Sequence, residues 1–295
     1  MSAPATIAEL TPRAARERPE ELAISDGDVR LSYRELHARA DAFARALLGR
    51  GVAHGDRVAI WAPNTWRWVA AALGAHAIGA VLVPINTRYK GDEAAHVLAS
   101  SGARVLVTAD QFLGTRYLEL LATPPEIAVT DATWSAFHDG LAPEAELHRA
   151  RARVSPQDIG DMMFTSGTTG APKGILATHA QTLRAFGDWA SIVGLRGGDR
   201  YLVVAPFFHS FGYKAGMLAA LMTGATIHPH AIFDADSVLA RIAAERISVL
   251  PGPPTLYVSL LQHPERASAD LRSLRLAVTG AAVVPVELVH RMRDT

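Results

Sequence analysis

The sequence lacks cysteine altogether, in a chain of 295 residues. This absence excludes disulfide bonds and thiolate metal sites, and it is typical of a reducing compartment such as the cytoplasm. An excess of one charge is lacking as well, because 29 Lys and Arg residues balance 29 Asp and Glu residues. Without a basic excess, the composition does not favour nucleic-acid binding.

Long apolar runs are also missing. No stretch approaches the roughly 20 apolar residues that cross a bilayer, and the N-terminal segment is charged where a signal peptide would be apolar. We therefore expect a cytoplasmic protein without a membrane span. What is present is an ordinary globular mixture, 49% hydrophobic and 20% charged, in a chain long enough for one large domain or two smaller ones.

Strand-like and helix-like segments alternate along most of the chain. Apolar runs at residues 57–62, 80–84 and 104–108 are separated by segments with helical periodicity. This alternation predicts an α/β fold with mostly parallel sheets flanked by helices. The pattern weakens before the charged stretch 143–153, which we interpret as a connection. We expect a first α/β subdomain over 1–155 and a second over 156–295.

Short-range signals predict individual elements near the N-terminus. Asp26-Gly27-Asp28 lies between two short apolar runs and predicts a β-hairpin. Ser32 followed by Glu35 predicts a capping box at the start of a helix. Asn64 is expected to cap a helix that runs to about Gly79.

A loop rich in glycine and hydroxyl groups follows the apolar run at residues 162–164. Between Thr165 and Gly174 the sequence reads Thr-Ser-Gly-Thr-Thr-Gly-Ala-Pro-Lys-Gly. Glycines allow several backbone N–H groups to point at one place, hydroxyls add donors, and Lys173 adds a cation, so the loop suits a polyphosphate. The alternative is a solvated turn, which seldom carries a flanking strand and a fixed Lys. A P-loop is excluded because Pro172 and Gly174 flank the Lys, where that motif requires Gly and Ser or Thr.

This loop resembles the phosphate-binding signature of the AMP-forming adenylate synthetase superfamily, in its acyl-CoA synthetase branch. Further segments resemble that family's motifs in the same order along the chain. They are residues 32–35, 80–86, the aromatic and histidine motif 206–212, and the turn 279–282 with Pro285 behind it.

The resemblance implies a reaction in two steps. A carboxylate attacks the α-phosphate of ATP to give an acyl-adenylate and pyrophosphate, and the thiol of CoA then displaces AMP. ATP, CoA and Mg²⁺ are the implied cofactors, and a carboxylic acid is the implied substrate. The implied ATP-binding and phosphate-binding residues are Thr165, Ser166, Gly167, Thr168, Thr169, Gly170 and Lys173.

The resemblance also assigns an acyl side and an adenine side. His209 would orient the substrate carboxylate and, with Lys173, form the catalytic pair. The implied acyl-pocket residues are Phe208, His209, Phe211, Gly212 and Tyr213, and the implied adenine contacts are Gly280, Ala281 and Ala282. Without the resemblance, His209 among aromatic residues reads more readily as a core histidine, and Gly280 as part of a tight turn.

Two other polar features admit structural explanations. Lys214, beside an apolar helix, could pair with a polar group of the substrate or reach solvent. His228 and His230 invite a metal interpretation, but no cluster of acidic residues or cysteines supports it.

The chain departs from the family pattern at its end. The Tyr-Gly-x-Thr-Glu segment that carries the magnesium ligand, and the small C-terminal domain with its catalytic Lys, would lie beyond Thr295. We therefore expect no metal ligand in this chain. We also expect the 295 residues alone not to adenylate at a useful rate, which pyrophosphate release would test.

The sequence thus predicts the N-terminal portion of an AMP-forming acyl-CoA ligase that acts on a hydrophobic or ring-bearing acid. Residues 206–215 and 249–256 look most like ligases for propanoate side chains on steroid-derived rings. A medium-chain fatty acid or an aryl acid is the alternative substrate. Adenylation of an amino acid for another thiol, or a non-catalytic nucleotide-binding or interaction module, are the alternative functions. A homodimer is compatible with the sequence.

Overall fold

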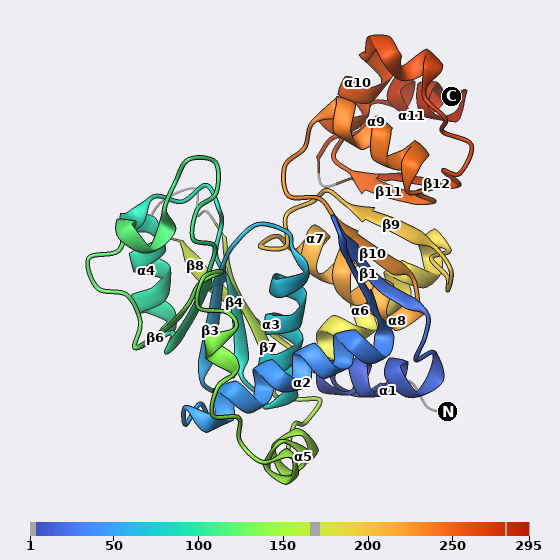
Figure 1. Cartoon of the computed structure of the whole chain (residues 1–295). Coiled ribbons are helices and arrows are strands. Elements are labelled where there is room, and N and C mark those ends of the chain that lie inside the picture. Colours follow the sequence, from blue (N-terminus) through green and yellow to red (C-terminus); the bar gives the residue numbers. More distant parts are fainter. Residues whose placement is uncertain (1–3, 166–171, 281, 295) are drawn as a thin grey trace.

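The computed structural model describes residues 4–165, 172–280 and 282–294. Within these residues the strands form two six-stranded sheets, which make two lobes side by side (Figure 1). The first sheet has the order β6-β5-β3-β4-β7-β8 and the second the order β12-β11-β9-β10-β1-β2. In the first sheet only β7 and β8 pair antiparallel, and in the second only β1 and β2. The predicted α/β fold with mostly parallel sheets flanked by helices is confirmed.

The strands are short, as expected for a parallel sheet covered on both faces. Those of the first sheet are β3 (Arg57–Trp61), β4 (Val81–Pro84), β5 (Val105–Thr108), β6 (Ile127–Val129), β7 (Ile159–Thr165) and β8 (Lys173–Thr178). Those of the second sheet are β1 (Leu22–Asp26), β2 (Val29–Ser32), β9 (Arg200–Val203), β10 (Thr226–Pro229), β11 (Val249–Gly252) and β12 (Leu276–Thr279).

The helices cover the faces of the sheets, and α2 lies across the base of both lobes in Figure 1. Those of the N-terminal half are α1 (Leu10–Glu17), α2 (Tyr33–Gly49), α3 (Trp66–Ala77), α4 (Gly91–Ser101) and α5 (Glu144–Ala152). The others are α6 (His179–Val193), α7 (Ser210–Gly212), α8 (Ala219–Thr223), α9 (Ala235–Ala244), α10 (Pro254–Gln262) and α11 (Val286–Arg293). A π-helical turn, Tyr213–Leu218, joins α7 to α8. Among the described residues, none of the helices combines the length and apolarity that a bilayer crossing requires.

The two sheets exchange strands across the predicted boundary at residue 155. β1 and β2, from the N-terminus, complete the second sheet, whereas β7 and β8, which flank the predicted phosphate loop, belong to the first. The division of the chain at 155–156 therefore does not coincide with the division between the sheets. The strands that flank the predicted phosphate loop belong to the first sheet, and the aromatic and histidine motif follows a strand of the second.

Several local predictions can be compared with the structure directly. The hairpin of β1 and β2 is present, and Ser32 and Glu35 form the capping box through hydrogen bonds of 3.2 and 2.7 Å. The stretch 143–153, interpreted as a connection, is mostly helical, because α5 occupies most of it and buries Leu147. Asn64 does not cap α3; the cap is Thr65, whose side chain accepts from the Trp68 backbone N–H.

Candidate active site

The second sheet brings the two predicted ligand motifs to one edge. Its strands β9, β10, β11 and β12 run parallel, so their carboxyl ends share an edge. The motif with His209 follows β9, and Gly280 follows β12 directly, with β11 between these two strands. The carboxyl ends of parallel strands are where open α/β sheets bind ligands. The sheet therefore presents both predicted motifs on its ligand-binding edge.

The first sheet contributes the hairpin on which the phosphate loop is predicted. Thr165 ends β7 and pairs with Lys173, which begins β8, and both side chains are exposed. A Cβ on Gly174 would lie 2.9 Å from the Met162 Cγ, so the Met162 side chain packs closely against the start of β8. The five predicted phosphate-binding residues Ser166, Gly167, Thr168, Thr169 and Gly170 lie outside the described residues. The structure thus fixes the two ends of the loop.

His209 has one ring nitrogen committed to the protein. Its Nδ1 accepts a hydrogen bond of 3.2 Å from the Phe211 backbone N–H at the start of α7. In the neutral ring, the proton is then on Nε2, which can donate to a ligand. Desolvation by the surrounding protein lowers the pKa of His209, so the ring is neutral at pH 7. A neutral donor suits a carboxylate that must stay nucleophilic.

The other predicted acyl-pocket residues divide into two groups. Phe208 and Phe211 are half-buried, and they lie beside His209, which is exposed. Gly212 and Tyr213 are buried, and the Tyr213 hydroxyl lies 2.7 Å from the His76 Nε2. Phe208 and Phe211 can therefore face a substrate directly, whereas Gly212 and Tyr213 hold the motif from behind.

Asn64 is a supporting residue that the sequence did not reveal. Its side-chain amide donates to the carbonyls of Val203 and Ala205, at 3.0 and 2.9 Å. Its carbonyl accepts from the Phe207 backbone N–H at 2.7 Å. Asn64 is buried in the loop after β3 of the first sheet, so it holds the chain that leads to His209 from the opposite lobe. No local signal in the sequence identifies this role, because the backbone that Asn64 holds lies about 140 residues away.

Lys214 is buried in an ion pair and does not reach solvent. Its Nζ lies 2.8 Å from the Asp161 Oδ1 and 3.2 Å from the Thr182 Oγ1. The side chain is 8% exposed and that of Asp161 is 1% exposed. The expectation that Lys214 reaches solvent was therefore wrong, because the π-helical turn directs the side chain inward toward an acidic partner on β7.

The predicted adenine-contacting turn is partly described. Gly280 follows β12, and a Cβ placed on it would meet no described atom within 4 Å. Open space beside backbone is what a flat ring requires. Ala282 is exposed, and Ala281 lies outside the described residues.

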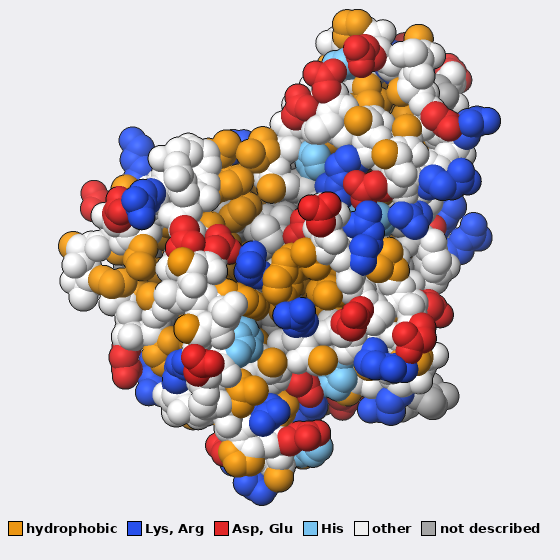
Figure 2. Space-filling view, in the orientation of Figure 1, with side chains coloured by type: hydrophobic (Ala, Val, Ile, Leu, Met, Phe, Trp, Pro, Cys, Tyr) orange, Lys and Arg blue, Asp and Glu red, His pale blue; other side chains and the backbone are white. Residues whose placement is uncertain are grey.

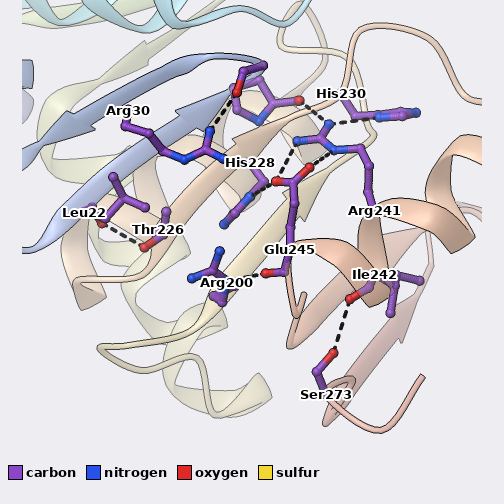
Figure 3. Close-up of polar contacts among 12 residues, drawn as sticks. Leu22, Arg30, Arg200, Thr226, His228, His230, Arg241, Ile242, Glu245 and Ser273 are labelled. Atoms are coloured by element: carbon purple, nitrogen blue, oxygen red, sulfur yellow. Dashed lines mark hydrogen bonds and ion pairs between the residues drawn. The ribbon is translucent and has the colours of Figure 1, made fainter. Parts of the chain in front are cut away.

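His228 and His230 are structural residues. The His228 Nδ1 lies 2.5 Å from the Glu245 Oε2, and the His230 Nδ1 accepts from Arg241 at 3.1 Å (Figure 3). Arg241 also donates to Glu245 and to the Pro229 carbonyl, at 2.6 and 2.7 Å. These contacts tie the end of β10 to α9. In the described part of the chain, no group of three or more His, Asp or Glu side chains could hold a metal.

Glu245 makes this cluster sensitive to acid. Burial alone would raise the pKa of Glu245, but hydrogen bonds from His228 and Arg241 outweigh it and lower the pKa to about 2. The carboxylate therefore stabilises the fold above the unfolded-state pKa near 4.5, and this stability is lost as the pH falls toward about 2. Glu245→Gln should lower the free energy of unfolding by about 2 kcal/mol at pH 7. Urea unfolding at pH 7, 4 and 3 should show this difference shrinking; a difference that is constant with pH would contradict the assignment.

With the site described, the chain can be compared with known proteins. The family model described as AMP-binding enzyme matches residues 11–295. The chain belongs to this family. A CoA ligase of Rhodococcus jostii, named for a methyl-dioxo-octahydroindenyl propanoyl group, is 47% identical over 310 residues. That match covers 99% of this chain and 60% of the relative, so the chain spans less than two thirds of the relative's length.

Solved structures agree with this family assignment. The inhibitor-bound N-terminal domain of FACL13 from Mycobacterium tuberculosis superposes with a TM-score of 0.86 at 30% identity, covering 98% of this chain and 73% of that one. The anthranilate CoA ligase AuaEII in complex with anthranoyl-AMP superposes with a TM-score of 0.89 at 25% identity, covering 98% and 56%. The predicted family, its acyl-CoA ligase branch and the match to an N-terminal portion are confirmed.

Proposed function

We propose that this chain supplies the ATP-binding and acid-binding parts of an AMP-forming acyl-CoA ligase. The observation that carries the proposal is the orientation of His209, whose Nδ1 is held by the Phe211 N–H on the sheet edge that also carries Gly280. The hairpin ending in Thr165 and Lys173 supplies the phosphate side from the other lobe. The proposal thus assigns the acid to His209, the adenine to the turn at Gly280, and the phosphates to the hairpin that ends in Thr165 and Lys173.

In the first step, an oxygen of the substrate carboxylate attacks the α-phosphorus of ATP. The bond from that phosphorus to the bridging oxygen breaks, and pyrophosphate leaves with the bonding electron pair. The two reacting partners are both anions, so the protein must hold them together against their repulsion. The Nε2–H of neutral His209 donates to the carboxylate without protonating it. The Lys173 ammonium and the loop N–H groups offset charge on the phosphates, and Mg²⁺ would share that role from ligands outside the described residues.

In the second step, the sulfur of CoA attacks the carbonyl carbon of the acyl-adenylate. The carbon–oxygen bond to AMP breaks, the thiol proton goes to solvent, and AMP leaves. The acyl body rests on the half-buried rings of Phe208 and Phe211, which favour an apolar or ring-bearing acid. The Rhodococcus ligase, named for a ring-bearing propanoyl group, supports the same substrate class. A medium-chain fatty acid or an aryl acid is the second choice.

The proposed reaction is tested by exchange of labelled pyrophosphate into ATP, which reports acyl-adenylate formation before any thiol is added. The assay uses a longer protein that carries the 295 residues. The 295-residue chain is run beside it, and we expect that chain alone not to adenylate at a useful rate. We expect exchange that depends on the acid, with ring-bearing propanoates above medium-chain fatty and aryl acids. Exchange that requires an amino acid would move the function to another branch. Binding of ATP without exchange for any acid, in every length of protein tested, would support a nucleotide-binding module instead.

Lys173→Ala should weaken ATP binding about tenfold or more, because the loop loses its cation at the phosphates. AMP has fewer phosphate charges, so its affinity should fall less. Arg149→Ala is a matched control, since it removes an exposed cation from α5, which lies away from the β7–β8 hairpin in Figure 1. Titration calorimetry with both nucleotides checks the prediction. Equal losses for Lys173→Ala and Arg149→Ala would contradict it.

A further inference from the structure

An ion pair between Lys214 and Asp161 lies beneath the junction of the two lobes. The Lys214 Nζ is 2.8 Å from the Asp161 Oδ1 and 3.2 Å from the Thr182 Oγ1, and both charged side chains are more than nine-tenths buried. The Tyr213 ring beside them is fully buried and hydrogen-bonds His76. None of these side chains has a role in the proposed reaction.

The three residues of this ion-pair cluster come from the segments that flank the site. Asp161 lies on β7, four residues before Thr165, and Thr182 lies on α6, which follows β8. Lys214 lies five residues after His209, in the turn that follows α7. One ammonium group therefore contacts the segment before the phosphate hairpin and the segment after it, while its own backbone continues from His209.

The segment that carries Lys214 fits tightly against the second sheet. A Cβ on Gly216 would lie 2.8 Å from a methyl carbon of Val203, on β9. The turn is π-helical, a form that inserts an extra residue into a helix and is frequent at functional sites. The backbone around Gly216 packs directly on β9. We therefore expect any shift of the Lys214 backbone to move the segment that begins at His209.

Stability alone does not explain a pair of this kind. Desolvation of two buried charges commonly offsets their attraction, and apolar replacements of similar size are often neutral or stabilising. Burial raises the pKa of Asp161 even though the positive charge of Lys214 acts to lower it. The raised pKa reflects the cost of desolvating the Asp161 carboxylate. A buried ion pair of this kind can instead fix the distance between the elements that carry its two residues, here β7 and the turn after α7.

We propose that Lys214 and Asp161 are positioning residues that set the spacing between the phosphate hairpin and His209. The expected effect on catalysis rests on the proposed function. The expected effect on the distance between the hairpin and His209 does not. Removal of the pair should leave a folded protein in which the hairpin and His209 no longer keep one relative position. Adenylation should then slow, because misplacement of reacting groups by about 1 Å can cost roughly a hundredfold in rate.

The test separates positioning from stability with a double variant. Lys214→Met alone leaves an unpaired buried carboxylate and should lower the melting temperature. Lys214→Met combined with Asp161→Leu removes both charges at similar volume and should recover a melting temperature within about 4 °C of wild type. If the pair were merely structural, acid-dependent pyrophosphate exchange would recover with it. We expect exchange to remain at least tenfold below wild type.

A distance measurement tests the same point without relying on catalysis. Because the chain has no cysteine, spin labels can be placed on Ile175→Cys, an exposed position of β8, and on His209→Cys. In the double variant the distance distribution between the labels should shift or broaden. A distribution and an exchange rate that both match wild type would overturn the proposal.

A milder substitution keeps the test decisive should the double variant fail to fold. Thr182→Val removes the α6 hydroxyl that contacts Lys214 and also hydrogen-bonds Asp161, and it should produce a smaller change in the same distance distribution. No change in that variant, with the double variant unfolded, would also overturn the proposal. Wild-type protein that shows no exchange with any acid would instead refute the proposed function, and the spin-label result would still decide the positioning claim.

Discussion

Gly212→Ala should destabilise the protein by about 3 kcal/mol and misplace His209. A Cβ at this position would lie 2.2 Å from the Pro206 carbonyl oxygen and 2.3 Å from that of Ala205. Both oxygens are backbone atoms, and Asn64 holds the same segment through three hydrogen bonds. The segment therefore cannot yield without breaking other contacts.

Gly187→Ala is the matched control for this prediction. Gly187 lies within α6, and an added Cβ there would meet no described atom within 4 Å. Since glycine inside a helix costs about 0.5–1 kcal/mol relative to alanine, this variant should be slightly more stable than wild type. Urea unfolding measures both variants. Two substitutions of the same kind should thus have effects of opposite sign, and a Gly212→Ala protein as stable as wild type would contradict the packing described here.

Asn64→Ala should cost about 3 kcal/mol of stability as well. The substitution leaves the carbonyls of Val203 and Ala205 and the N–H of Phe207 without their partner, and each unsatisfied buried group costs about 1–3 kcal/mol. We expect the total for the three groups to stay near the lower bound of about 1 kcal/mol each, because the backbone can relax and admit water. The loss should appear at the site too, as weaker binding of an acyl-adenylate mimic, since this backbone leads to His209.

Two further variants isolate the role of Asn64. Asn86→Ala removes an amide that, among the described residues, accepts one local hydrogen bond, from the Arg88 N–H in a turn. It should cost at most about 1 kcal/mol. Asn64→Asp keeps the shape and the acceptor for Phe207 but loses the two donated bonds. It should fall between wild type and Asn64→Ala, or below both if the new charge faces the two carbonyls. Stability of Asn64→Ala equal to that of Asn86→Ala would refute the bridging role.

The features that were predicted from sequence are those whose signals are local. The capping box of Ser32 and Glu35 needs only four residues, and the turn at Gly27 lies between its own strands. The helix from His179 to Val193 has local signals at both ends, because Thr178 caps it and Gly194 ends it with a positive φ. The motif around His209 was recognised because its residues are consecutive.

The features that were missed depend on residues far apart in the chain. Asn64 lies about 140 residues from the backbone it holds, and nothing near Asn64 in the sequence encodes that contact. The sequence around Lys214 and Asp161 does not predict that they pair, because the pairing requires the π-helical turn and the packing of β7 against the other lobe. The exchange of β1–β2 and β7–β8 between sheets is likewise a property of the assembled fold. Figure 2 shows the recess between the lobes that this assembly produces, with apolar side chains along its left-hand wall.

The most direct test of the account is the affinity of the chain for a non-hydrolysable acyl-adenylate mimic relative to AMP. The mimic, an acyl-sulfamoyl adenosine with a ring-bearing propanoyl group, occupies the adenine, phosphate and acid positions together. Titration calorimetry should show the mimic binding at least a hundredfold tighter than AMP, because it adds the acyl and carboxyl contacts of a reaction intermediate. His209→Ala should reduce that ratio about tenfold. Equal affinities for the mimic and AMP, or a ratio unchanged by His209→Ala, would contradict the account.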